Sequence, residues 1–205
     1  MTNSVVIVKI TRMTRIESVL TDIDAVNAED PASSLWAGSL HPQAWIEGRR
    51  AHHWALELTP GASEPLQLAA RAHHMRRWEV ARESFSRTRH GYHAWRSRLY
   101  DFHADALDGL MRAYGYAEEE RAAATALLHK RGIKTDAEAQ TYEDAVSLAF
   151  LEIRLASFAE TVDESQLTNA LRRTWRKMGP AGHEAALALD LEPRARHAIE
   201  RALAG

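Results

Sequence analysis

Residues 135–160 constrain the fold more than any other segment, because their apolar side chains cover nearly every side of a predicted helix. Val146, Leu148, Leu151 and Leu155 illustrate this pattern. A helix that is apolar all round is stable only when other elements cover it on every side. We therefore expect this helix to lie at the centre of the molecule, with amphipathic helices packed around it.

Helical spacing of apolar residues recurs along the rest of the chain, and no alternating strand pattern is evident. Further helices are predicted at 14–26, 43–58, 63–78, 91–114, 117–130, 168–178, 181–189 and 193–203, with loops at 33–42 and 79–90. The 205 residues suit one large domain. The sequence thus predicts an all-α fold: a single helical domain at 14–205, preceded by an N-terminal extension at 1–13. The native start is either Met1 or Met13.

Composition excludes several classes of chemistry. The chain has no cysteine, so disulfides, thiolate zinc sites, iron–sulfur clusters and cysteine nucleophiles are ruled out. The net charge of −2 is small, so the overall charge of the chain indicates no particular class of charged binding partner. No apolar run near the N-terminus is long enough for a signal peptide or a membrane span, so the expected location is the cytoplasm, with no membrane contact. The sequence leaves the oligomeric state open.

The predicted helix at 63–78 ends in an unusual set of side chains. Ser63 is a suitable N-cap, and an apolar stripe follows it. The stripe leads to two adjacent histidines, His73 and His74, and then to Arg76 and Arg77. A core helix seldom ends this way, so we expect this segment to form the floor of a site.

Two further residues could complete a metal site with these histidines. His103 and Asp144 lie on apolar faces of two other predicted helices. The set His73, His74, His103 and Asp144 would suit one divalent transition metal, namely Mn, Fe, Co, Ni or Zn. The alternative is structural: a lone core histidine usually packs and forms hydrogen bonds, and Asp144 could serve the dipole of its own helix.

An arginine-rich band covers residues 71–98, with eight arginines against two glutamates. Guanidinium groups bind phosphate through paired hydrogen bonds, and neighbouring aromatic rings can stack on a base. The band could equally be a solvated face with Arg–Glu pairs. The substrate-binding candidates from this band and the preceding helix are Arg50, Arg82, Trp78, Trp95 and Arg96.

Several long motifs resemble the domain of unknown function 4202 family. They are AVNAEDP, EGRRAHHWALEL, LAARAHHMRRWEVARESF, GYHAWRSRLYDFHADAL, QTYEDAVSLAFLE and RTWRKMGPAGHEAALALDL. The resemblance extends from Arg15 to Leu203. It implies family membership but little mechanism.

The order of elements more remotely resembles the HD-domain metal phosphohydrolases. The stretch LAARAHHM is similar to the superfamily segment that supplies an adjacent His-Asp ligand pair, with His74 in place of the aspartate. This resemblance implies an HD-domain-like bundle, in which the first metal histidine would fall near Glu47, or else at His52 or His53.

Three hypotheses follow. The first is a metal-dependent phosphohydrolase acting on a nucleotide or another small phosphate ester, with Glu143 as base and with Arg76, Arg77 and Arg82 holding the phosphate. The second is a metal-free helical module that binds RNA or a nucleotide through the arginine-rich face. The third is a structural or regulatory partner protein. The sequence therefore permits both an enzyme and a non-enzymatic binding protein.

Overall fold

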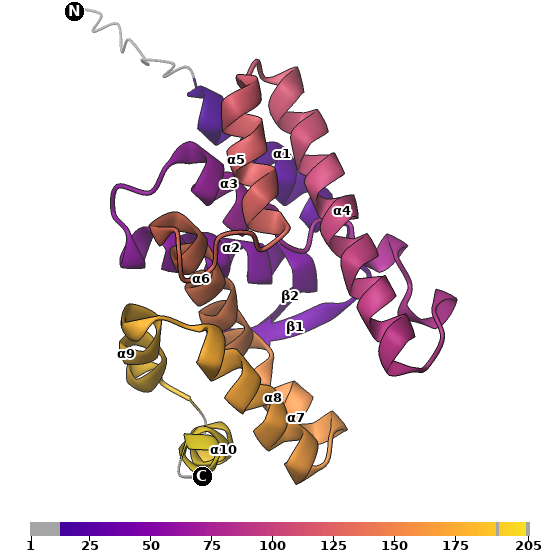
Figure 1. Cartoon of the computed structure of the whole chain (residues 1–205), viewed down its shortest axis with the longest axis vertical. Helices are drawn as coiled ribbons and strands as arrows, with labels where there is room; N and C mark the ends of the chain where they lie inside the picture. The colour runs from indigo at the N-terminus through magenta and orange to yellow at the C-terminus, as the bar shows by residue number, and fades with distance from the viewer. Residues whose placement is uncertain (1–12, 192, 204–205) are drawn as a thin grey trace, which may run out of the picture.

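The computed structural model describes residues 13–191 and 193–203, so most of the predicted extension at 1–13 lies outside the described residues. The predicted all-α single domain is confirmed (Figure 1). The helices are α1 (Arg15–Asn27), α2 (Gln43–Leu58), α3 (Glu64–Ala72), α4 (Arg89–Ala113), α5 (Glu118–Leu128), α6 (Ala137–Ile153), α7 (Leu155–Thr161), α8 (Glu164–Lys177), α9 (Pro180–Ala188) and α10 (Pro193–Leu203), with short 3₁₀ turns η1 (Arg77–Glu79) and η2 (Arg82–Ser84).

Helix α6 occupies the centre, as its apolar sequence predicted, and α2 packs along it (Figure 1). Its first half belongs to an apolar cluster shared with α1 to α5. Its second half, including the buried Leu148 and Leu151, joins a second cluster formed with α7 to α10. The predicted continuous helix at 135–160 is wrong in one respect, because the chain turns at Arg154 between α6 and α7. The Arg154 guanidinium there pairs with Glu47 at 3.1 Å.

The segment 33–42 forms a β-hairpin, so the prediction of a loop there is wrong. Strands β1 (Ser33–Trp36) and β2 (Ser39–Pro42) pair antiparallel, with Leu35 opposite Leu40. Ala37 and Gly38, between the strands, both have left-handed backbones, with φ of 48° and 78°. Two left-handed residues are typical of tight hairpin turns. The strands are only four residues long, and β1 buries Ser34 while Leu35 and Leu40 are exposed, so no alternation of apolar residues marks the strands in the sequence.

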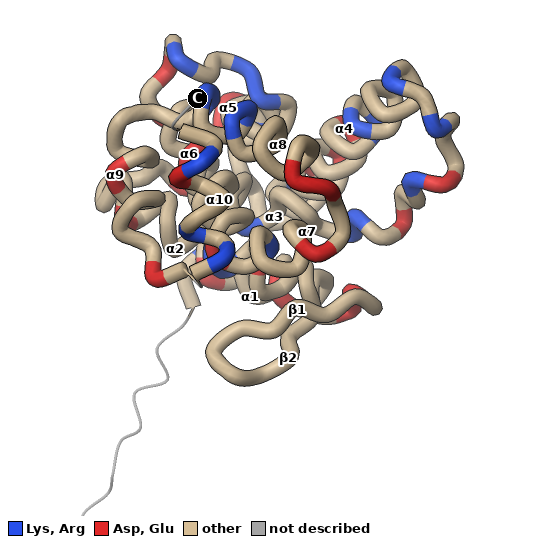
Figure 2. Tube along the Cα trace, turned by 90° about the horizontal axis from the view of Figure 1, so that it is seen from below, with Lys and Arg blue, Asp and Glu red and all other residues tan. Residues whose placement is uncertain are grey.

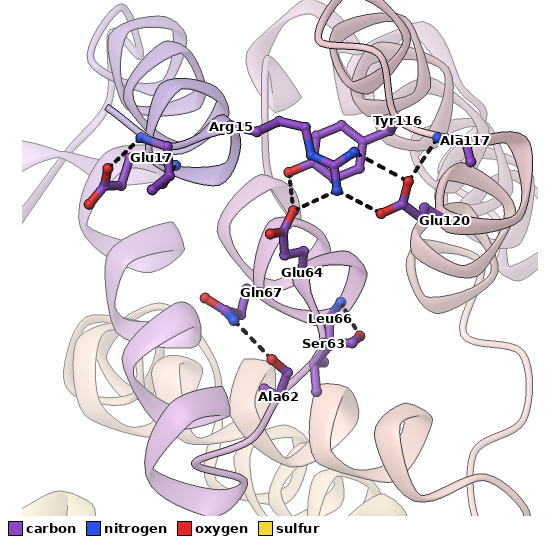
Figure 3. Close-up of polar contacts among 11 residues, drawn as sticks. Arg15, Glu17, Ala62, Ser63, Glu64, Leu66, Gln67, Tyr116, Ala117 and Glu120 are labelled. Atoms are coloured by element: carbon purple, nitrogen blue, oxygen red, sulfur yellow. Dashed lines mark hydrogen bonds and ion pairs between the residues drawn. The ribbon is translucent and has the colours of Figure 1, made fainter. Parts of the chain in front are cut away.

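One polar cluster connects the N-terminal ends of three helices (Figure 3). The Arg15 guanidinium at the start of α1 pairs with Glu64 of α3 at 3.1 Å and with Glu120 of α5 at 2.7 Å. It also lies 3.6 Å above the Tyr116 ring, whose hydroxyl donates to Glu64 at 2.6 Å. Because these carboxylates lie in the first turns of α3 and α5, they also favour the positive ends of those helices.

Helix α3 begins as predicted, with the Ser63 side chain accepting from the Leu66 amide. It stops at Ala72, however, so the predicted end at residue 78 is wrong. Arg76 takes up a left-handed backbone with φ of 55°, which a continuing helix cannot accommodate. His73, His74 and Arg77 therefore lie on a turn after α3, where their side chains are free to point toward α2 and α4.

The segment between α3 and α4 extends away from the other helices, and its basic positions are all arginines (Figure 2). Within the described part of the chain, no helix is both long enough and apolar enough to cross a membrane.

Candidate functional site

A cavity of about 950 Å³ lies where the turn after α3 meets helices α4, α6 and α8. This volume is within the usual range for small-molecule sites, about 300–1,000 Å³. The polar lining comes from α2, the turn after α3, α4, the α5–α6 connection, α6, α8 and the α6–α7 junction. The polar side chains that line it include Glu47, His73, His74, Arg77, Tyr92, Arg96, Tyr100, His103, Lys130, Tyr142, Glu143, Arg154, Arg173, Arg176 and Lys177.

Three side chains at one side of the cavity could hold a metal ion. Glu47, His73 and His74 each offer a ligand atom, and these atoms all lie within 4.8 Å of one another. Gly48 explains how α2 comes so close to the end of α3: a Cβ at this position would lie 2.4 Å from the Arg71 carbonyl oxygen. The missing side chain at residue 48 thus permits the approach that brings Glu47 to the histidines.

His103 of α4 lies at the edge of this group. Its ring centroid is 6.2 Å from that of His74, whereas the His73 and His74 rings are 4.1 Å apart. The Nε2 atom of His103 is buried and has no hydrogen-bond partner among the described residues. A buried nitrogen without a partner is costly unless a ligand, water or ion occupies the space beside it.

The three histidines share one hydrogen-bonding arrangement. Nδ1 of His73 lies 2.9 Å from the Ala70 carbonyl oxygen, and Nδ1 of His103 lies 2.9 Å from that of Met75. Nδ1 of His74 contacts the Glu47 carboxylate. Each oxygen can only accept, so in a neutral ring the proton lies on Nδ1 and the lone pair lies on Nε2. Metal-binding histidines in proteins commonly have such an oxygen partner on the second ring nitrogen.

Burial keeps these rings neutral. It lowers the pKa of His103 to about 4, and it holds the pKa values of His73 and His74 well below the usual value. The nearby Arg77 charge acts in the same direction on the pKa of His74. At neutral pH the rings can therefore act as lone-pair donors.

Positive charge predominates in the rest of the lining. Seven lysine and arginine side chains line the cavity against two glutamates, although the whole chain has a net charge of −2. The cations are Arg77, Arg96, Lys130, Arg154, Arg173, Arg176 and Lys177. The cavity is thus suited to an anionic ligand.

The two adjacent arginines that we expected to bind phosphate differ in their surroundings. Arg77 lines the cavity and lies 4.8 Å from the centre of the Trp95 ring. Its guanidinium forms no hydrogen bond or ion pair with any residue that the structure describes. Burial lowers the Arg77 pKa, but this group remains charged. Arg76, by contrast, is exposed, pairs with Glu79 at 2.6 Å and does not line the cavity.

Asp144 does not join the histidines, although it was predicted as a metal ligand. Its carboxylate accepts from the Gly179 amide at 2.8 Å and from the Gln140 side chain at 2.9 Å. Burial raises its pKa, and these two donors oppose the rise. Asp144 therefore connects α6 to the start of α9, and Glu47 is the carboxylate beside the histidines.

Among the predicted substrate-binding residues, Trp95 and Arg96 line the cavity, whereas Arg50, Arg82 and Trp78 do not. Arg50 pairs with Glu152 at 2.7 Å. Arg82 donates to the backbone carbonyls of Phe85 and Ser86, so it stabilises its own loop.

Glu143, the predicted base, does line the cavity but is already paired. Its buried carboxylate accepts from the Lys130 ammonium and lies 3.5 Å from that of Lys177. Because its two contacts are both to lysine ammonium groups, this geometry favours a role in placing the lysines.

Several lining residues were not among the predicted site residues: Tyr100, Lys130, Tyr142, Arg154, Arg173, Arg176 and Lys177. Trp175 to Pro180 does stand out in the sequence as an aromatic and two cations before a Gly-Pro turn. This motif draws attention to the cations at the end of α8. No spacing rule, however, places these cations beside the histidines of the cavity, which lie about a hundred residues earlier in the chain. His52 and His53, the other options near Glu47, lie outside the cavity, and His52 contacts the Gln67 side chain at 3.3 Å.

Comparison with known proteins confirms the family. The family model for the domain of unknown function 4202 (DUF4202) matches residues 17–199, so the chain belongs to this family. Neither a search of curated proteins nor a search of solved structures found a match.

Proposed function

We propose that the protein is a metal-dependent phosphohydrolase acting on a small phosphate ester, with Glu47, His73, His74 and His103 around the metal ion. The observation that carries this proposal is the shared arrangement of the three histidines. Each has Nδ1 beside an oxygen, which leaves the Nε2 lone pair available, and His103 Nε2 has no described partner. One carboxylate with neutral imidazoles is a donor set that suits Mn, Fe, Co, Ni or Zn.

The other lining residues supply what hydrolysis of a phosphate ester needs from the protein. Arg77 has a guanidinium with no described partner beside the histidines, and it would bind the phosphoryl oxygens and stabilise their developing charge. Arg154 pairs with Glu47 at 3.1 Å and would keep that carboxylate oriented. In the reaction, a water oxygen bonds to phosphorus, the phosphorus–ester oxygen bond breaks, and the leaving oxygen takes up a proton.

A bound divalent ion would polarise the phosphoryl group and lower the pKa of a water ligand. Glu143 is then not required as a base. The remote resemblance to HD-domain phosphohydrolases supports the same assignment, since His73 and His74 occupy the stretch that is similar to the ligand pair of that superfamily.

The test is metal content and turnover of protein purified without a polyhistidine tag or chelator. We expect about one equivalent of a transition metal, and hydrolysis of at least one compound in a panel of phosphate esters and nucleotides. In His74→Ala, both metal and hydrolysis should be lost while the helical circular dichroism signal is kept. Wild-type turnover in His74→Ala, or turnover that survives complete removal of metal, would contradict the proposal.

A second candidate is a metal-free module that binds a nucleotide or RNA. The cation excess of the lining favours it, together with aromatic side chains such as Trp95, Tyr100 and Phe158 in the same cavity. A cavity of about 950 Å³ suits a nucleotide better than a long RNA strand. This candidate predicts strongly salt-dependent nucleotide binding that is unchanged by chelators and by His74→Ala.

A further inference from the structure

A second group of cations lies around Glu143, in the same cavity as the histidines. The buried Glu143 carboxylate is in contact with the ammonium of Lys130, from the α5–α6 connection, and lies 3.5 Å from that of Lys177, from the end of α8. One carboxylate can balance only one of these two charges.

Arg96 of α4 adds a third cation to the lining. Its guanidinium donates to the hydroxyls of Tyr100 and, at 3.4 Å, Tyr92. Burial raises the pKa of Tyr100 above its usual value, so this phenol offers Arg96 no negative charge. No ion pair satisfies Arg96 among the residues that the structure describes. Three cations thus share one anion in this part of the cavity.

The placement of these cations around Glu143 is unfavourable for the stability of the fold. The Lys130 side chain is only 19% exposed, and its backbone is left-handed with φ of 58°, which is unfavourable for a residue with a Cβ. Burying the Lys130 ammonium beside a carboxylate that it shares with Lys177 is also unfavourable. Lysine is rare here, with four in the chain, yet two of them meet at Glu143. An anionic ligand would balance the excess charge.

We propose that Arg96, Lys130 and Lys177 form a second anion-binding subsite, separate from the phosphoryl position beside the histidines. The substrate is then a phosphate ester whose leaving group carries another anionic group, either a second phosphate or a carboxylate. The assignment of this substrate class rests on the proposed function. If the phosphate ester is hydrolysed beside the histidines, the anionic group bound at the second subsite must belong to the leaving group.

The subsite is tested by isothermal titration of chelator-treated and Mn-loaded protein with four probes. Inorganic phosphate and methylphosphonate have one anionic group, whereas pyrophosphate and phosphonoacetate add a phosphate or a carboxylate. We expect pyrophosphate to bind about tenfold or more tightly than phosphate, or phosphonoacetate to bind about tenfold or more tightly than methylphosphonate. A charge-assisted hydrogen bond typically contributes enough free energy for a roughly tenfold gain in affinity. Which of them shows the gain identifies the second group as phosphate or carboxylate.

Lys177→Met should abolish this gain, so that each two-group probe binds the variant no more tightly than its single-group counterpart does. Lys134→Met is the matched control, since it removes the same charge from an exposed lysine outside the cavity. Arg96→Met provides an independent second variant, and circular dichroism checks that each variant is folded. Equal binding of all four probes to the wild-type protein, or a gain that survives in both Lys177→Met and Arg96→Met, would overturn the proposal.

The outcomes separate this inference from the proposed function. A gain sensitive to Lys177→Met in a protein without metal or turnover supports the subsite and rejects the hydrolase. Metal-dependent turnover with no gain for either two-group probe rejects the subsite and supports the hydrolase.

Discussion

The His74 ring and the Glu47 carboxylate are in direct contact although they are 27 residues apart in the chain. Glu47 lies within α2, and His74 lies on the turn after α3. Glu47 is only 3% exposed, so its charge depends on His74 and on Arg154 for stabilisation. A buried carboxylate next to neutral imidazoles also offers the negative charge that a divalent cation requires. This contact connects the packing of α2 on α3 to the chemistry of the cavity.

Replacement of a cluster histidine should remove metal binding. We expect His73→Gln to weaken Mn or Zn affinity by about tenfold or more, since loss even of an indirect partner of a metal ligand costs about 10–100-fold. Elemental analysis after dialysis against a metal buffer measures the effect. His53→Gln is the control, because His53 lies on α2 but outside the cavity. Equal metal content in the two variants would exclude His73 as a ligand.

Replacement of Asp144 should affect stability and not metal content. Asp144→Ala leaves the Gly179 amide and the Gln140 side chain without their acceptor. We expect the free energy of unfolding in urea to fall by about 1–3 kcal/mol, which is typical for loss of hydrogen bonds to a charged group. Metal content per folded protein should stay at the wild-type value. Loss of metal from a folded Asp144→Ala protein would restore Asp144 as a candidate ligand.

The adjacent arginines provide a matched pair of variants. Arg77→Met removes a cation that has no described partner in the cavity, so affinity for inorganic phosphate should fall by about 10–100-fold, in line with about 1.5–3 kcal/mol for a charged hydrogen bond. Arg76→Met removes the same charge from a side chain that pairs with Glu79 outside the cavity, so phosphate binding should change by less than about twofold. Titration calorimetry compares the two, and similar losses in both would indicate a general charge effect.

The sequence predicted the helices far better than the arrangement of the site. Apolar spacing identified the central helix, and capping chemistry located the start of α3, because both depend on neighbours within a few residues. The loop predicted at 33–42 and the end predicted for α3 were wrong, since both features depend on non-glycine residues with left-handed backbones, Ala37 beside Gly38 in the hairpin turn and Arg76 after α3.

The site itself depends on contacts between distant segments. His73, His74 and Arg77 were identified because they interrupt an apolar stripe locally. Residues such as Lys130 and Lys177 reach the cavity only through the packing of α6 against its neighbours, which no local pattern specifies. Asp144 was misassigned for the same reason. Glu143 and Asp144 are adjacent buried residues of α6, and only the packing shows that Glu143 faces the cavity while Asp144 accepts from the Gly179 amide.

His52 should make stability depend on pH. Its burial, reinforced by the positive charge of Arg71, lowers its pKa to about 4 in the folded protein, against 6.5 as the reference value. The unfolded chain thus binds the proton more tightly, so the stabilisation is complete above pH 6.5 and is lost as the pH falls toward 4. Between these limits we expect a loss of about 1–3 kcal/mol in the free energy of unfolding, allowing for partial solvent screening. The quantity to measure is the difference in the free energy of unfolding between the wild-type protein and His52→Gln, obtained from urea unfolding at pH 7.5 and at pH 4.5. A difference that is the same at both pH values would show that His52 does not titrate in this way.

Gly48 should tolerate no side chain, because its position sets the distance between α2 and α3. A Cβ there would lie 2.4 Å from the Arg71 carbonyl oxygen, which is backbone and cannot move alone. We expect Gly48→Ala to lower the free energy of unfolding by about 2 kcal/mol or more, as overpacking usually costs about 1–3 kcal/mol. Gly109→Ala is the control, since Gly109 lies within α4 with open space around its Cβ position. This control variant should raise the free energy of unfolding by about 0.4–1 kcal/mol.

Because Glu47 precedes Gly48, the Gly48→Ala protein should also bind metal more weakly under conditions where it remains folded. Wild-type stability and wild-type metal content in Gly48→Ala would mean that the close approach of α2 to α3 does not position Glu47.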